Sequence, residues 1–175
     1  MEDRSVNTST LLLVFTLDRQ RYALHLDVVE RVVRAVAVTP LPDAPEIVHG
    51  IIDVQGRIVP VINMRACFHH PEKQMDTSDQ FIIAATPAGT FALVADAVLE
   101  VLACPSAGVV PSGEILPQME RVAGVMILAD GMVLISGLDK ILALAGEALP
   151  GDRLQGCAAI GGQAGERQLG QSHEL

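Results

Sequence analysis

Histidines and acids are the residues of this chain that could bind a metal ion. The chain has five histidines, at positions 25, 49, 69, 70 and 173. His69 and His70 are adjacent and could supply two ligands, but the nearest acids, Glu72 and Asp76, lie in a polar stretch typical of an exposed loop. A structural zinc site needs a closed set of about four ligands. The sequence shows no such set, so it predicts no metal site.

A catalytic site would need a nucleophile, a base and polar groups that converge in space. No serine stands in the Gly-x-Ser-x-Gly context of a nucleophile elbow. The segment 50–56 contains two glycines but does not open a helix, so it is not a phosphate-binding loop. We therefore expect neither an enzyme nor a cofactor. A β-barrel that binds a small ligand through His25, His49 and Asp53 is the alternative from another functional class.

Cysteine usage and hydropathy favour a soluble, cytoplasmic protein. The three cysteines are far apart and form no C-x-x-C pair, which is typical of reduced thiols: Cys67, Cys104 and Cys157. The N-terminus lacks a basic region, and its apolar run at 11–15 is too short for a signal peptide. No apolar run approaches the ~18 residues that span a bilayer, so we expect no direct membrane insertion.

The charge of the chain argues against nucleic acid as a partner. The formal net charge is -9, and aromatic residues make up 3% of the chain. Nucleic-acid affinity depends largely on Lys and Arg that neutralise phosphates, and single strands also stack on aromatic side chains. We therefore expect no nucleic-acid binding.

Short apolar runs separated by turn residues predict a series of strands. The expected strands are 11–17, 22–25, 47–54, 58–63, 80–86, 90–95, 97–102, 122–128 and 132–136. Asp130-Gly131 is the strongest hairpin turn, and Gln55-Gly56-Arg57 is expected to form another. Pro60 lies inside an expected strand, and because proline cannot donate to a ladder we expect an edge strand or a bulge there.

Three short helices are expected, two between strands and one after the last strand. Asp27 as a cap, with Glu30 three residues later, predicts a short helix through Val33. A helical turn is expected at 64–68 and a terminal amphipathic helix at 138–144. The remaining segments are predicted to be connectors and loops, at 35–45, 69–78 and 103–120.

These elements together predict an all-β fold with short helices. Half of the chain is apolar, which is enough for a substantial core. Strands such as 48–54 and 91–95 are apolar on both faces and need cover on both sides, so two packed β-lobes fit better than one open sheet. The valines of the expected short helix could pack in the core, as most do, or could meet a partner.

Several segments together resemble the CheW-like domain family. The family pattern has a proline-rich connector, a Gly-Val-Ile-Asn-x-Arg-Gly turn, and an Ile-Val-Pro-Val-Val-Asp-Leu-Arg strand followed by Phe. The matching segments here are Val29–Val33, Thr39–Pro45, Gly50–Arg65 and Phe68, with Ala92–Val101, Gly124 and Asp130–Lys140 further along. The resemblance covers about residues 11–145.

The resemblance implies two intertwined five-stranded SH3-like β-barrels with a groove between them. It implies a chemotaxis adaptor that couples chemoreceptor cytoplasmic tips to the regulatory domain of the histidine kinase CheA, and that is recruited to membrane-associated receptor arrays. Residues 1–10 are expected to be a flexible N-terminus, 11–145 the CheW-like domain, and 146–175 a disordered tail. The expected partner-binding residues are Val29, Val32, Val33, Asp53, Gln55, Gly56, Arg57 and Val98.

One departure from the family pattern lies in the turn at 53–57. Gln55 stands where the family usually has arginine, and Arg57 follows two residues later. We expect Arg57 to point to the same side of the turn and to help orient the partner there. An adaptor in a chemosensory pathway other than motility is the alternative within the same family.

Overall fold

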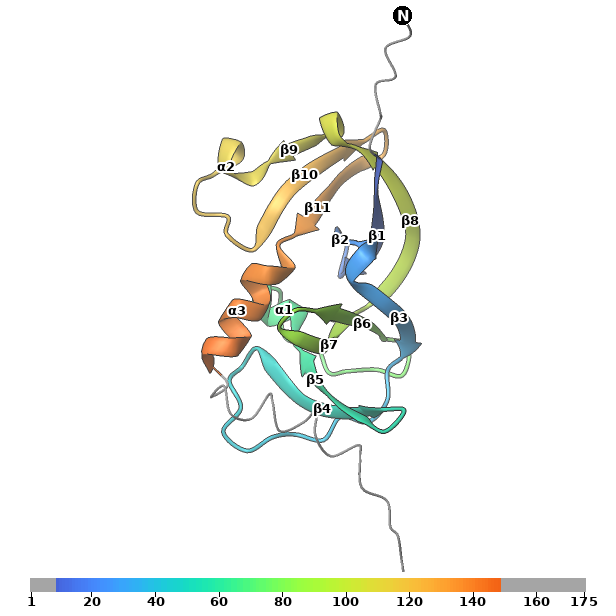
Figure 1. Ribbon diagram of the computed structural model, residues 1–175, viewed down its shortest axis with the longest axis vertical. Helices are drawn as coiled ribbons and strands as arrows, with labels where there is room; N and C mark the ends of the chain where they lie inside the picture. Colours follow the sequence, from blue (N-terminus) through green and yellow to red (C-terminus); the bar gives the residue numbers. More distant parts are fainter. Residues whose placement is uncertain (1–8, 149–175) are drawn as a thin grey trace, which may run out of the picture.

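The computed structural model describes residues 9–148, which form two β-sheets and a few short helices. The first lobe is a six-stranded sheet in the order β8-β1-β2-β11-β10-β9, and the second lobe is a five-stranded sheet in the order β3-β6-β7-β5-β4. Figure 1 shows β8 curving along one side of the molecule and helix α3 along the other. The strands are β1 (Ser9–Leu17), β2 (Gln20–His25), β3 (Val29–Arg34), β4 (Val48–Val54), β5 (Arg57–Ile62), β6 (Gln80–Thr86), β7 (Gly89–Ala95), β8 (Ala97–Pro105), β9 (Val109–Pro111), β10 (Val122–Leu128) and β11 (Gly131–Ser136). The helices are η1 (Leu26–Val28), α1 (Met64–Cys67), η2 (Ser106–Gly108), α2 (Ser112–Ile115) and α3 (Leu138–Ala148).

The two lobes are intertwined through the order of their strands. β1 and β2 begin the first lobe, β3 to β7 build the whole second lobe, and β8 to β11 return to complete the first. The chain therefore crosses between the lobes after β2 and after β7. These crossings confirm the predicted all-β, two-lobed fold, with six strands in the first lobe where five were expected.

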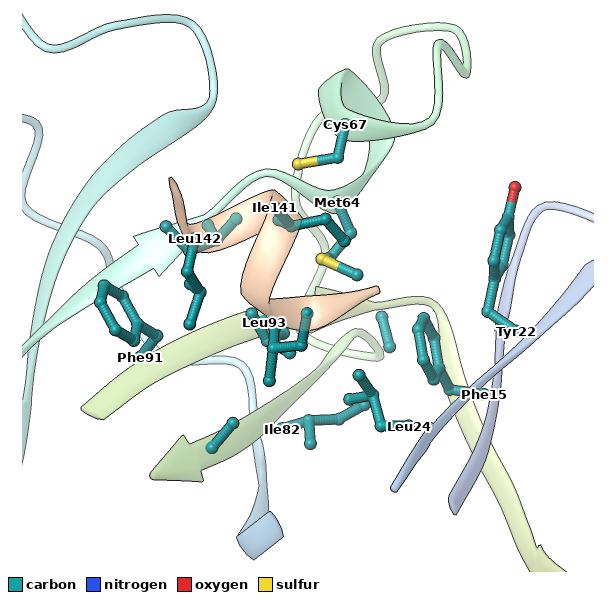
Figure 2. Close-up of a cluster of buried hydrophobic side chains, with 14 of the residues drawn as sticks. Phe15, Tyr22, Leu24, Met64, Cys67, Ile82, Phe91, Leu93, Ile141 and Leu142 are labelled. Carbon is teal, nitrogen blue, oxygen red and sulfur yellow. The ribbon is translucent and has the colours of Figure 1, made fainter. Parts of the chain in front are cut away.

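Strands that are apolar on both faces line two cores at once. In β1, Leu12 and Val14 point into a core inside the first lobe, whereas Leu13 and Phe15 point into a core shared by both lobes. β6 and β7 divide their side chains in the same way between the shared core and a core inside the second lobe. Figure 2 shows side chains of the shared core: Phe15, Tyr22, Leu24, Met64, Cys67, Ile82, Phe91, Leu93, Ile141 and Leu142. Because burial of apolar area is the main favourable term in folding, this core binds the lobes into one unit.

The segment that follows β3 pairs with β4, the edge strand of the second lobe. Thr39 and Ile51 exchange two backbone hydrogen bonds of 2.9 Å, which join this segment to the edge strand β4. Gly50 permits the approach, because a Cβ at this position would collide with the carbonyl oxygen of Thr39. Its φ of 148° is also one that side-chain-bearing residues rarely adopt. Position 50 therefore has to be glycine, because the backbone of Thr39 comes so close to it.

The predicted helix from Asp27 to Val33 is wrong. Only Leu26–Val28 form a single 3-10 turn, and β3 follows directly and pairs antiparallel with β6. The 3-10 turn has no side-chain cap hydrogen bond. Val29, Val32 and Val33 are β-branched and gain a strand partner in the tertiary structure, and this gain outweighs the weak local helix signal.

Two further expectations need correction. Pro60 lies neither in an edge strand nor at a bulge, because β5 lies between β7 and β4 and Pro60 is regularly paired with Ile51. The parallel ladder of β5 with β7 begins only at Val61, so the missing amide of Pro60 falls where β5 has a single neighbour. The expected loop at 103–120 contains the end of β8, all of β9 and helix α2. β9 is held there by its pairing with β10, a long-range contact that the local sequence does not reveal.

Other predicted elements agree closely with the structure. The strand expected at 80–86 matches β6, and the expected helices at 64–68 and 138–144 correspond to α1 and α3. The flexible N-terminus expected at 1–10 and the disordered tail expected at 146–175 lie almost wholly outside the described residues. The domain boundaries stay predictions.

Candidate partner-binding surface

The β4–β5 hairpin presents the expected polar residues on a rigid turn. Gln55 and Gly56 are its two central residues, and both have positive φ, at 54° and 82°. Such a pair twists with the strands that it joins, as in tight two-residue hairpins. The carboxylate of Asp53 accepts a 2.6 Å hydrogen bond from the backbone N–H of Gly56. Asp53, Gln55 and Arg57 are thus exposed on a turn whose backbone is locally fixed.

An ion pair joins this turn to β3 at the opposite edge of the sheet. Arg57 Nη2 lies 2.6 Å from Glu30 Oε1, and the Arg57 side chain is 49% exposed. Exposed ion pairs contribute little to stability, typically below about 1 kcal/mol. The pair therefore mainly orients Arg57, whose exposed half can still donate to a partner. The structure thus brings the expected residues of the turn close to those of β3.

The three expected valines of β3 are half-buried. Val29 and Val32 pack against the shared core, and Val33 packs against the core of the second lobe. Their register with β6 places them opposite Ala84, Ile82 and Phe81. Much of their apolar surface is therefore used for folding, and a partner would meet only the remaining part.

Val98 lies near the start of β8, just after the chain has left the second lobe, and exposed apolar residues follow it. Val98 is half-buried against the shared core, and its backbone N–H donates a 2.6 Å hydrogen bond to the Gln80 side chain. Leu99 and Val101 are then 50% and 47% exposed, and Leu11 on the neighbouring β1 is 47% exposed. We call Leu11, Leu99 and Val101 the β8 strip. Clustered exposed apolar residues on an edge strand are typical of a protein-binding surface.

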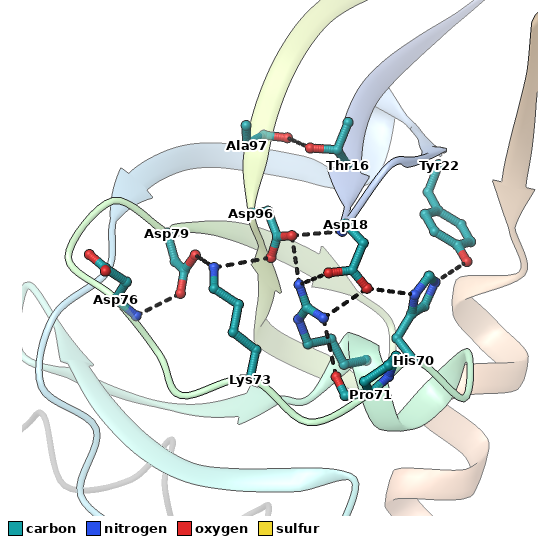
Figure 3. Close-up of polar contacts among 11 residues, drawn as sticks. Thr16, Asp18, Tyr22, His70, Pro71, Lys73, Asp76, Asp79, Asp96 and Ala97 are labelled. Atoms are coloured by element: carbon teal, nitrogen blue, oxygen red, sulfur yellow. Dashed lines mark hydrogen bonds and ion pairs between the residues drawn. The ribbon is translucent and has the colours of Figure 1, made fainter.

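A network of charged residues connects the two lobes, and it was not predicted from the sequence. Arg65 on α1 makes two hydrogen bonds to Asp18, of 2.9 and 3.0 Å, and one of 2.6 Å to Asp96. Asp18 belongs to the β1–β2 turn of the first lobe, and Asp96 separates β7 from β8 (Figure 3). We call Asp18, Arg65 and Asp96 the interlobe clasp. Hydrogen bonding from the Arg65 guanidinium lowers the pKa of Asp18, so this carboxylate stays ionised at neutral pH.

Neighbouring groups support the clasp from both sides. His70 lies 3.1 Å from Asp18 through Nδ1 and 2.7 Å from the Tyr22 hydroxyl through Nε2 (Figure 3). Burial raises the pKa of Tyr22 to about 12, so its hydroxyl stays protonated and can donate to His70. Lys73 Nζ lies 3.7 Å from Asp96 and 2.8 Å from the buried Asp79. A signal for this network was present, because a charge inside an apolar segment, such as Arg65 or Asp96, has to be paired when it is buried.

A second arginine, Arg121, also connects the two lobes at α1. Arg121, just before β10 in the first lobe, donates a 2.6 Å hydrogen bond to the carbonyl oxygen of Cys67 at the end of α1. Its Nη1 also lies 3.0 Å from His69 Nε2. The last carbonyls of a helix lack partners within the helix, and Arg121 supplies one. The four-residue helix α1 is therefore linked to the first lobe twice, through its own Arg65 and through Arg121.

Comparison with protein families decides the assignment. The model of the CheW-like domain matches residues 11–146. The chain belongs to the CheW-like domain family. The segments that resembled this family in sequence form β3 and the connector after it, the β4–β5 hairpin with α1, most of β7 with the start of β8, and β11 with the start of α3.

Individual relatives support the assignment. A chemotaxis protein CheW of Treponema pallidum is 28% identical over 96 residues, which is 53% of this chain and 56% of that protein, so the match spans little more than half its length. A chemotaxis protein CheW of Rhizobium meliloti is 24% identical over 132 residues, covering 74% of this chain and 85% of the relative. The crystal structure of the scaffolding protein TtCheW from Thermoanaerobacter tengcongensis matches with a TM-score of 0.72 and 26% identity, covering 82% of this chain and 99% of that one.

The CheW-like fold does not bring together the residues of the alternative ligand site. His25 lines a small hollow of the first lobe beside Cys104, whereas His49 lines a separate hollow beside Met75 in the second lobe. Asp53 lines neither hollow and stands on the exposed hairpin turn. Among residues 9–148, no three His, Cys, Asp or Glu side chains are placed to hold a metal ion. The small-ligand interpretation thus loses the arrangement that it required.

No helix in the described part of the chain is both long and apolar enough to cross a membrane.

Proposed function

We propose that this chain is a chemotaxis adaptor that couples chemoreceptors to a histidine kinase. The observation that carries the proposal is the match of the CheW-like domain model to residues 11–146. The fold supports it, because the similar structure from Thermoanaerobacter tengcongensis is that of a scaffolding protein. An adaptor of this kind works by holding its partners in register, and it needs no catalytic group of its own.

The receptor partner is proposed to be the cytoplasmic tip of a chemoreceptor. We assign it to the surface formed by the hairpin turn, the exposed part of β3 and the β8 strip. Arg57, held at 2.6 Å from Glu30, supplies a charged anchor, and Leu99 and Val101 supply apolar contact area. A buried apolar centre with a polar rim is the usual anatomy of a specific protein interface.

The kinase partner is proposed to be the regulatory domain of CheA, docked at the ends of the lobes. The lobes end in exposed turns such as Asp130-Gly131, where Ile127 and Met132 are 67% and 58% exposed. Separate surfaces for the two partners would allow both to bind at once. The adaptor would then be recruited to receptor arrays at the membrane through the receptor and not through a membrane segment of its own.

The proposal is tested by reversing the charge of Arg57. We expect Arg57→Glu to weaken binding to a chemoreceptor tip fragment by about tenfold or more, since truncating a central charged contact often costs over 1 kcal/mol. Its free energy of unfolding should fall by no more than about 1 kcal/mol, because the Arg57–Glu30 pair is partly exposed. Isothermal titration calorimetry and urea unfolding measure the two effects.

A matched control is Arg19→Glu, which makes the same charge change on an exposed residue of the β1–β2 turn. It should leave receptor binding unchanged. Equal weakening by both variants would mean that net charge alone matters, and a large loss of stability in Arg57→Glu would make Arg57 a structural residue.

A further inference from the structure

The corner between β7 and β8, where the chain passes from the second lobe to the first, is held by hydrogen bonds from both lobes. The N–H of Asp96 donates to the carbonyl oxygen of Thr16 at 2.9 Å, and the Thr16 hydroxyl donates to the carbonyl oxygen of Ala97 at 3.4 Å. One residue later, Val98 donates to the Gln80 side chain. Thr16 belongs to β1 of the first lobe and Gln80 to β6 of the second. Residues 96–98 are thus hydrogen-bonded to both lobes. We call them the junction, because they couple the placement of one lobe to that of the other.

The Arg65 side chain bonds this junction to α1 of the second lobe. The side chain is 10% exposed, and its guanidinium bonds Asp18, Asp96 and the carbonyl oxygen of Pro71. The planar fork of arginine suits such bidentate contacts, which fix direction as well as distance. Arg65 therefore determines how the β1–β2 turn and the start of β8 are placed relative to α1.

The clasp is better suited to fixing geometry than to supplying stability. Removing charges from water costs free energy that their mutual attraction often only balances. The shared apolar core already holds the lobes together. Asp18 is 46% exposed and Asp96 20% exposed, so water can solvate them if the clasp is opened. Variants of the clasp are therefore expected to fold.

The two halves of the proposed receptor-binding surface belong to different lobes, which the clasp joins. The hairpin turn with Arg57 belongs to the second lobe, whereas the β8 strip belongs to the first and begins three residues after Asp96. We propose that Arg65 is a positioning residue for partner binding: through Asp18 and Asp96 it fixes the relative placement of the lobes, so that one partner can contact both halves at once. This inference rests on the proposed function of the surface.

The experiment measures lobe placement and binding in the same set of variants. Spin labels at Ala85→Cys on β6 and Ala129→Cys in the β10–β11 turn, in a Cys157→Ser background, report the distance between the lobes by pulsed EPR. Both positions are exposed, whereas Cys67 and Cys104 are buried and should resist labelling. The variants are Arg65→Gln, Arg65→Lys and Asp18→Asn. Asp130→Asn is the control, because it breaks the Arg21–Asp130 ion pair inside the first lobe and leaves the clasp intact.

We expect a broader distance distribution and about tenfold weaker binding of a chemoreceptor tip fragment in Arg65→Gln. A tenfold loss corresponds to about one tenth of the molecules remaining in the binding arrangement. Arg65→Lys, which keeps the charge but loses the fork, should recover part of the affinity, and Asp130→Asn should match the unmodified chain. Asp18→Asn gives the same readout if Arg65→Gln does not fold.

An unchanged distance distribution, or a broadened one with unchanged affinity, would overturn the inference. If the unmodified chain does not bind the receptor fragment, the proposed function fails, and the EPR distances by themselves still decide whether the clasp holds the lobes in place.

Discussion

Replacing Gly50 with alanine tests whether the second lobe is closed by the contact between Thr39 and Ile51. The new Cβ would collide with the Thr39 carbonyl oxygen and would lie 2.9 Å from a methyl group of Val38. Real Cβ atoms essentially never come so close to other heavy atoms, so the segment before Pro40 has to move away from β4. The two backbone hydrogen bonds of 2.9 Å between Thr39 and Ile51 would then break.

The expected loss follows from these contacts. Two hydrogen bonds contribute about 1 kcal/mol each, and a residue with a side chain at this φ adds about 1–3 kcal/mol of strain. The free energy of unfolding should therefore fall by about 3–5 kcal/mol, a large part of the roughly 5–15 kcal/mol that stabilises a typical domain. Urea unfolding followed by circular dichroism measures this change.

The matched control is Gly56→Ala in the hairpin turn. Gly56 also has positive φ, at 82°, but a Cβ there would meet no heavy atom within 4 Å. Only backbone strain remains, so we expect a loss of about 1 kcal/mol. Equal losses of unfolding free energy in the two variants would refute the claim that the Thr39–Ile51 contact closes the second lobe. They would show that the positive φ alone explains why position 50 is glycine.

Three further predictions follow from the side chains already described. The double variant Glu30→Arg/Arg57→Glu restores an ion pair with its charges exchanged. It should recover the stability lost in Arg57→Glu, measured by unfolding, but not receptor binding, measured by calorimetry. Recovery of both would mean that the partner requires the ion pair and not the arginine at position 57. Tyr22 is the single tyrosine, and its raised pKa favours the protonated phenol in the folded state, so this contribution to stability is complete below pH 10 and is lost as pH rises toward about 12. Its near-ultraviolet titration should have a midpoint near 12 in the folded chain, and a midpoint near 10 would show that the Tyr22 hydroxyl is exposed to water. Burial raises the pKa of Cys67 to about 12 and also raises that of Cys104. In a Cys157→Ser variant, therefore, neither thiol should react with a thiol reagent until denaturant is added. Rapid labelling under native conditions would place them at the surface.

Most of the strands could be predicted because their signals are local. β6 and the β10–β11 hairpin stand out as β-branched runs beside turn residues, and their predicted positions agree with the structure. β3 was misread because Val29, Val32 and Val33 have the spacing of a helix face, and Asp27 looks like a cap. Its strand conformation depends on β6, which lies about fifty residues further along the chain.

The candidate site was only partly accessible to sequence reasoning. Asp53, Gln55, Gly56 and Arg57 could be predicted together because they share one short turn. The contact between Arg57 and Glu30 and the clasp of Arg65 with Asp18 join residues that are 27 and 47 positions apart. Such pairs are set by how the lobes interlock, and no local pattern encodes them. Which of these residues contact a partner stays a prediction.

The central claim is that one copy of this chain binds a chemoreceptor tip and a kinase regulatory domain at the same time, on separate surfaces. Sedimentation velocity on the mixture of all three tests it most directly. The account predicts a ternary species with one copy of the adaptor, and Arg57→Glu should lose the receptor fragment from it but keep the kinase domain. Displacement of one partner by the other would contradict the account, because it would place both on the same surface.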